Sequence, residues 1–144
     1  MSSNRGFTII EIMIVVVMIA ILASIAIPSY TQYVLRAKIQ EATSTLLAQR
    51  VKMEQFFQDS RTYAGATAGN SDTGTSKNFD FNTTGGGADT RTATGYTRFA
   101  VGKGSMTGFT YQVDQANVKK SSVTGVSGWS GSDTCWVTKQ GGQC

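Results

Sequence analysis

Histidine is absent from this chain of 144 residues, and cysteine and proline are rare, with two copies and one copy. Without histidine, neither a Ser/His nor a Cys/His nucleophile pair can form. The cysteines, Cys135 and Cys144, are not a CxxC pair, which gives no support to a zinc site or a redox motif. No two carboxylates occur in a recognisable acid–base arrangement. We therefore expect that the protein is not an enzyme and uses no metal or cofactor.

Charged residues are also few, at 15% of the chain, and they give a formal net charge of +4. This mildly basic balance does not by itself predict a nucleic-acid surface. Between Phe7 and Ile27, Glu11 is the only charged residue. A carboxylate near the middle of a bilayer costs about 2.5–3.5 kcal/mol on insertion scales, so Glu11 is expected to have a partner and a function.

The apolar run at residues 7–27 has 21 residues. As a helix it would measure about 32 Å, which is enough to span a bilayer. A plain transmembrane anchor is one interpretation, but it leaves Glu11 unexplained. An ordinary secretory signal peptide is another, with residues 13–23 as its apolar core and Ser24-Ile25-Ala26 as its cleavage site. A glutamate inside the apolar segment argues against the signal peptide.

Beyond Pro28 the sequence becomes amphipathic. Apolar residues recur there at the spacing of a helix with one buried face, namely Leu35, Ile39, Ala42, Leu46, Met53 and Phe56. We predict one helix from about Phe7 to about Gln58, with a hydrophobic half at residues 7–28 and an amphipathic half at residues 29–58. Pro28 is the one helix breaker, and it predicts a kink or a local opening.

The remaining residues, 59–144, predict a small globular head, which makes the chain α+β. A long loop rich in glycine, serine and threonine covers residues 64–95, with one short strand near residues 79–81. Alternating or apolar segments predict further strands at residues 96–101, 109–113, 118–126 and 135–138. Three or four of these strands would form an antiparallel sheet against the amphipathic half of the helix.

The leader at residues 1–6 ends in Gly6, and together with Phe7 and Glu11 it resembles the class III signal of type IV prepilins. The resemblance implies that a prepilin peptidase cleaves after Gly6 and methylates the new N-terminus at Phe7. It also implies that Glu11 neutralises the N-terminal amine of a neighbouring subunit during assembly. A carboxylate and an ammonium are each costly alone in an apolar core and tolerable as a pair. In relatives the helix melts around the proline that corresponds to Pro28.

Two further segments resemble this family. Residues 50–57 followed by Arg61-Thr62-Tyr63 resemble pilins of the PilE type, and residues 135–144 resemble the C-terminal disulfide loop of the family. A bridge between Cys135 and Cys144 would add roughly 2–3 kcal/mol to a small exported head, and two free buried thiols are the alternative. The implied fold is the type IV pilin fold, in which a long N-terminal α-helix packs against a small antiparallel β-sheet.

The leading hypothesis is a structural subunit of a type IV pilus fibre, supporting adhesion, twitching motility and DNA uptake. Such a subunit would form a homo-oligomer in a helical filament. Its other partners would be the prepilin peptidase, the inner membrane and the pilus assembly machinery. The precursor would lie in the inner membrane, and the mature chain would lie in the extracellular fibre of a bacterial cell.

Two alternatives stay open. The first is a minor pilin that acts as a DNA-uptake receptor, binding phosphates through basic side chains and stacking bases on aromatic ones. The candidates are Lys103, Lys119, Lys120 and Lys139 for the phosphates, and Trp129 and Trp136 for the bases. An ordinary solvated lysine surface would have the same composition. The second alternative is a pseudopilin of a type II secretion system, but the C-terminal loop and the lack of an obvious acidic metal cluster argue against it.

Overall fold

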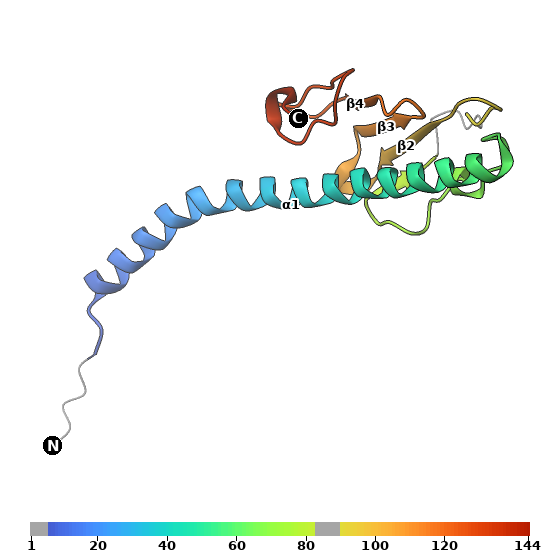
Figure 1. Cartoon of the computed structure of the whole chain (residues 1–144). Helices are drawn as coiled ribbons and strands as arrows, with labels where there is room; N and C mark the ends of the chain where they lie inside the picture. Colours follow the sequence, from blue (N-terminus) through green and yellow to red (C-terminus); the bar gives the residue numbers. More distant parts are fainter. Residues whose placement is uncertain (1–5, 83–89) are drawn as a thin grey trace. The chain divides into compact units, whose positions relative to one another are not determined.

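The computed structural model describes residues 6–82 and 90–144 (Figure 1). Residues 1–5 of the predicted leader and residues 83–89 of the predicted loop lie outside the described residues. The main elements are α1 Ile9–Ser60, β1 Phe79–Phe81, β2 Thr97–Gly102, β3 Phe109–Asp114 and β4 Lys119–Val123. Short 3₁₀ helices occur at η1 Thr67–Gly69, η2 Gly104–Met106 and η3 Gln140–Gly142. The predicted α+β class, with one long helix and a small antiparallel sheet, is confirmed.

The long helix begins with a side-chain cap. The Thr8 hydroxyl accepts a hydrogen bond of 3.2 Å from the backbone N–H of Glu11, which satisfies one of the free donors of the first turn. α1 continues for 52 residues, and both of its ends lie close to the predicted ones. The chain divides after Leu35 into two compact units.

The first unit contains the apolar part of α1, and this part has no buried face. The large apolar side chains from Phe7 to Ile27 are between 50% and 82% exposed. A helix that is hydrophobic all round requires apolar surroundings, either lipid or other helices. By length and composition, α1 could cross a membrane.

α1 runs through Pro28 without interruption. Because proline has no N–H, the carbonyl of Ser24 loses its usual helical donor. Nearby hydroxyls bond to other carbonyls: Ser24 Oγ donates to Ile21 O at 2.7 Å, and Ser29 Oγ donates to Ile25 O at 3.1 Å. Such side-chain bonds slightly destabilise a helix and favour bending. The section around Pro28 is therefore weaker than its neighbours, and its opening in a fibre stays a prediction.

The second unit, which starts at Arg36, contains an antiparallel sheet of order β1-β2-β3-β4 (Figure 1). β3 has the expected period of two, because Phe109, Tyr111 and Val113 are buried and the residues between them are half-buried. α1 supplies the other side of the core with the buried residues Ile39, Ala42, Thr43, Leu46 and Met53. β4 ends at Val123, earlier than predicted, and the chain turns at Gly125, whose φ is 73°.

Polar contacts also join α1 to the rest of this unit. Lys38 Nζ donates to Ser105 Oγ, within η2, at 2.7 Å. Asn78 Nδ2 donates to Glu41 Oε2 at 2.8 Å, directly before β1. These contacts hold the amphipathic part of α1 in register with the loops that flank the sheet.

One predicted strand is wrong, because residues 135–138 do not form a strand. The reason is the side chain of Ser121 on β4. Its hydroxyl donates to the Cys135 carbonyl and accepts from the Val137 N–H, both at 2.8 Å. A side chain, and not a neighbouring strand, therefore satisfies these backbone groups. The apolar pair Trp136 and Val137 that suggested a strand is buried within a loop.

Candidate assembly and surface sites

The predicted cleavage point precedes α1. Gly6, Phe7 and Thr8 are not helical, and the helix begins at Ile9. The Phe7 side chain is 81% exposed, and a Cβ placed on Gly6 would meet no atom within 4 Å. An exposed, non-helical peptide bond suits proteolysis. The geometry is therefore compatible with cleavage between Gly6 and Phe7.

Glu11 lies in the first turn of α1, where the helix dipole favours a negative charge. It lines a shallow surface together with Phe7, Ile12, Val15 and Val16. The carboxylate and the residue that would carry the mature N-terminus thus lie on one side of the helix start. Among the residues described, Glu11 has no ion-pair partner, and the sequence places no Lys or Arg between Glu11 and Leu35. A cation for Glu11 must therefore come from outside this part of the chain.

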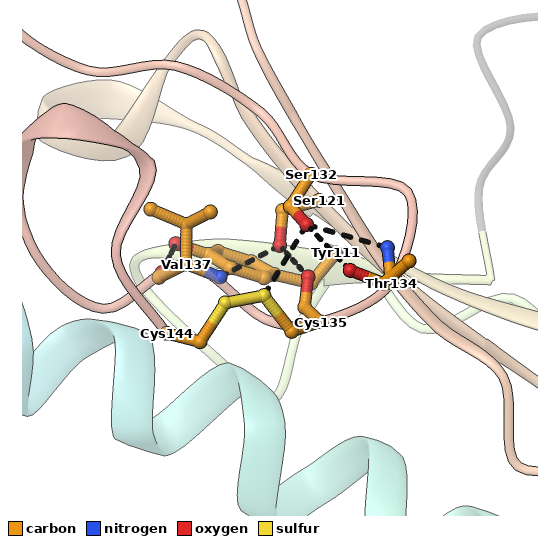
Figure 2. The surroundings of a disulfide bond; sticks show 7 residues. All are labelled: Tyr111, Ser121, Ser132, Thr134, Cys135, Val137 and Cys144. Atoms are coloured by element: carbon orange, nitrogen blue, oxygen red, sulfur yellow. Dashed lines mark hydrogen bonds between the residues drawn. A yellow bond between two sulfur atoms is a disulfide. The ribbon is translucent and has the colours of Figure 1, made fainter.

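Cys135 and Cys144 are joined by a disulfide, with their Cα atoms 6.0 Å apart (Figure 2). The residues between them turn back at η3, where Gly141 and Gly142 both have positive φ values. The N–H of Thr138 donates to the carbonyl of Gln143 at 2.8 Å, which closes the turn inside the covalent loop. The loop is thus fixed by both a covalent bond and a backbone hydrogen bond.

The start of this C-terminal loop is docked on the sheet by side chains (Figure 2). Besides the two bonds of Ser121, the Tyr111 hydroxyl donates to the Val137 carbonyl at 2.9 Å. Trp136 Nε1 donates to the Gln112 carbonyl at 2.8 Å. Burial raises the pKa of Tyr111 above its usual value of 10.0, because the charged phenolate is disfavoured away from water. Sequence reasoning did not identify Ser121 or Tyr111 as part of this loop.

The four lysines proposed for DNA contact have different environments. Lys103 Nζ lies 2.6 Å from Asp80 Oδ1 and 2.7 Å from the Thr73 carbonyl, so its charge is already compensated. Lys120 Nζ lies 3.8 Å from Asp133, at the long limit of an ion pair. Lys119 Nζ lies 5.0 Å from the centre of the Trp136 ring, a cation–π contact.

Lys139, the fourth lysine proposed for DNA contact, is exposed in the C-terminal loop. Of the four lysines, Lys103 is the least available for a phosphate, because its ammonium already contacts the carboxylate of Asp80 and the carbonyl of Thr73. The other three lie on β4 and on the C-terminal loop that docks against it.

The two tryptophans that were candidates for base stacking are buried in the head. Trp129 and Trp136 are each only 9% exposed. Trp129 contacts Phe109 edge to face, with ring centres 5.0 Å apart, and Trp136 is held by its bond to Gln112 and by Lys119. Their burial in a small head is explained by the need for core volume. Neither ring presents a free face to a nucleotide.

A polar cluster at the end of α1 was not predicted. Glu54 accepts hydrogen bonds from the hydroxyls of Tyr63 and Tyr96, at 2.9 Å and 2.8 Å. Burial, followed by these contacts with the Glu54 carboxylate, raises the pKa of both tyrosines. The two rings meet edge to face at 4.7 Å, within a core that includes Met53. This cluster fixes the loop after α1 and the segment that enters β2.

Comparisons with known proteins match both parts of the chain. Residues 28–120 match the family model described as "Type IV minor pilin ComP, DNA uptake sequence receptor". Residues 1–27 match the prokaryotic N-terminal methylation motif.

Three relatives illustrate the similarity. The type IV major pilin protein PilA of Myxococcus xanthus is 46% identical over 61 residues, which cover 42% of this chain and 28% of the relative. A fimbrial protein of Dichelobacter nodosus is 39% identical over 79 residues, covering 51% and 49%. The fimbrial protein EcpC of Eikenella corrodens is 41% identical over 56 residues, covering 39% and 37%. The matched part thus spans half or less of each relative's length.

Proposed function

The chain belongs to the type IV pilin family, because the family model of the minor pilin ComP matches more than half of it. We propose that it is a structural subunit of a type IV pilus fibre. The relatives named as major pilins and fimbrial proteins support this proposal. In it, the chain forms a homo-oligomeric helical filament outside a bacterial cell. A prepilin peptidase, the inner membrane and the pilus assembly machinery are its partners before that stage.

The observation that carries the proposal is the setting of Glu11. Between Phe7 and Ile27, Glu11 is the only charged residue, and the large apolar side chains of this part of the chain are at least half exposed. An exposed apolar helix must be surrounded by lipid or by other apolar helices. In such surroundings a carboxylate without a cationic partner costs free energy. A bundle of such helices solves both problems if the amine of Phe7 in one subunit pairs with Glu11 in another. Cleavage after Gly6 generates that amine.

Glu11→Gln tests this role, because it keeps the shape of the side chain and removes its charge. The variant should be processed and reach the membrane, yet give a strongly reduced yield of fibres when it is the sole copy. Ile19→Leu, an apolar exchange in the same run, serves as the control and should assemble normally. Intact mass should show loss of residues 1–6 and addition of one methyl group. A normal fibre yield from Glu11→Gln would overturn the assembly role.

The proposal also includes a function for Pro28. The freed Ser24 carbonyl and the neighbouring hydroxyl bonds support local opening when the helix passes from lipid into a bundle. A density map of the fibre decides this point. Irregular backbone around Pro28 is expected, and a regular helix through residues 20–30 would contradict it.

A second candidate function is DNA reception, which the family description and the basic residues of β4 favour. Lys119, Lys120 and Lys139 are the candidate phosphate contacts, whereas Lys103 is held by Asp80. Lys119→Ala combined with Lys120→Ala should weaken DNA binding by the purified chain. Each lost contact should also reduce the slope of log affinity against log salt by about 0.9. Lys52→Ala combined with Lys77→Ala, at two exposed lysines away from β4, is the matched control because it removes the same charge. Equal DNA affinity of the two variants would exclude this surface.

A further inference from the structure

Two tyrosines lie at the end of the apolar run of α1 with their side chains exposed. Tyr30 is 69% exposed and Tyr33 is 72% exposed. They are three residues apart, so their rings occupy neighbouring positions on the same side of the helix. In the described part of the chain, neither hydroxyl makes a hydrogen bond and neither ring contacts another aromatic ring. Each tyrosine has an apolar ring, which favours apolar surroundings, and a hydroxyl, which needs a hydrogen-bond partner.

We propose that Tyr30 and Tyr33 bind the headgroup layer of a bilayer and set the depth of the apolar helix in it. This inference rests on the proposed function only in that the precursor is held in a membrane. Tyrosine is enriched at membrane–water boundaries because its ring suits the acyl region and its hydroxyl suits the hydrated headgroups. The partner is therefore a lipid surface, and not a protein pocket.

The length of the helix supports this assignment. At 1.5 Å per residue, Tyr30 lies about 31 Å along the axis from Ile9, where α1 begins. The hydrocarbon core of a bilayer is about 30 Å thick. When Ile9 is at one edge of the core, Tyr30 is at the opposite edge and Tyr33 lies almost one turn beyond it. The tyrosines thus coincide with the boundary that the apolar length defines.

The composition around the pair supports the same boundary. Ser29, Thr31 and Gln32 are the first consecutive polar neighbours after the apolar run. No Lys or Arg occurs between Glu11 and Leu35, so no cationic side chain in this section can anchor the helix to headgroups. The nearest cationic side chain is Arg36, three residues beyond Tyr33, so the two tyrosines are the interfacial anchors nearest to the end of the apolar run.

A second copy of the helix is the competing occupant, and its chemistry fits less well. Residues 12–27 of another copy contain Ser24 as their only polar side chain. Ser24 Oγ is already bonded to Ile21 O. Two tyrosine hydroxyls packed against such a surface would lack partners, which is costly in an apolar setting. Hydrated headgroups supply those partners without any rearrangement.

The test measures the position of the boundary in the full chain, inserted in vesicles of phosphatidylethanolamine and phosphatidylglycerol. Single cysteines are introduced as Ile25→Cys, Thr31→Cys or Leu35→Cys, while the native disulfide leaves no other free thiol. A membrane-impermeant maleimide then reports exposure to water. In the parent chain, position 31 and position 35 should be labelled and position 25 should be protected.

Replacing the pair by Tyr30→Leu and Tyr33→Leu should extend the apolar run and draw position 31 into the bilayer. Its labelling rate should fall about tenfold or more relative to the parent. Tyr30→Trp with Tyr33→Trp should keep the parent rate, because tryptophan is also an interfacial residue. Ile21→Leu with Ile25→Leu, two apolar exchanges inside the run, is the control for Thr31→Cys and should not move the boundary.

Two results would overturn the proposal, and they can be told apart. An unchanged labelling rate at position 31 in the leucine pair would show that the tyrosines do not set the depth, while the membrane anchor and the pilin function would stand. Equal labelling at positions 25, 31 and 35 in every variant would show that the helix does not insert. That second result would also remove the membrane-bound precursor from the proposed function.

Discussion

Tyr96 donates its hydroxyl hydrogen to Oε1 of Glu54 across 2.8 Å, although 42 residues separate the two in sequence. The other carboxylate oxygen accepts from Tyr63. One side chain of α1 therefore holds both the loop that leaves the helix and the segment that enters β2.

Replacing Glu54 by leucine should destabilise the head, because two buried hydroxyls lose their acceptor. The expected loss is about 1–3 kcal/mol for each unsatisfied group. Urea unfolding of the purified full chain in detergent measures it, with Gln55→Leu at the exposed neighbour as the control. Adding Tyr63→Phe and Tyr96→Phe to Glu54→Leu should recover much of the loss, since no polar group is then left unpaired. A Glu54→Leu chain as stable as the control would show that the cluster is not stabilising.

High pH should destabilise the head through its buried tyrosines. The pKa values of Tyr96 and Tyr111 are raised in the folded chain above the usual 10.0, chiefly by burial. The unfolded chain therefore loses these protons first, and the stabilisation that is complete below pH 10.0 decreases as the pH rises above it. The slope should approach about 1.4 kcal/mol per pH unit for each tyrosine. Unfolding curves from pH 8 to pH 11, compared with those of Tyr96→Phe, measure it, and a slope unaffected by that substitution would contradict the assignment for Tyr96.

Removing the hydroxyl of Ser121 should loosen the C-terminal loop. Ser121→Ala leaves the Cys135 carbonyl and the buried Val137 N–H without their bonds, at a cost of about 1–3 kcal/mol. Ser122→Ala on the exposed side of the same strand is the matched control and should be nearly neutral. Hydrogen exchange at Val137 should become faster in Ser121→Ala alone. Equal exchange in both variants would mean that the loop is docked by other contacts.

Cys144→Ser should lower the stability of the head by roughly 2–5 kcal/mol, since the unfolded chain loses a cross-link. The amount of monomer in cells, and with it the number of fibres, should fall through degradation. Mass spectrometry with and without reductant checks the bond in native material. Because Ser121 and Tyr111 still hold Val137, exchange at that residue should rise less in Cys144→Ser than in Ser121→Ala. The reverse order would show that the covalent bond, and not the docking, positions residues 135–137.

The sequence predicted the parts of the fold that periodicity controls. The helix follows from an apolar run and an amphipathic stripe, and β3 follows from strict alternation at residues 109–113. Residues 135–138 were assigned wrongly because an apolar pair at Trp136 looks the same in a strand and in a docked loop. Only the position of Ser121 in three dimensions distinguishes the two cases.

Sequence reasoning was less successful for the surface sites. Tryptophans beside lysines suggested a base-stacking platform, but Trp129 and Trp136 fill the core of a small head. The Glu54 cluster could not be found because its partners are distant in sequence and tyrosine has no diagnostic spacing.

The docking of Val137 divides the C-terminal loop into a part that is bound to the sheet and a part that is not. Residues 135–137 are bound to the sheet, whereas residues 138–143 form a turn closed by the disulfide and by the bond between Thr138 and Gln143. Most of those later residues are exposed. An engineer who wished to display a foreign peptide on this protein would therefore insert it between Lys139 and Gln143, where the graft is clamped at both ends and the hydrophobic interior is left intact.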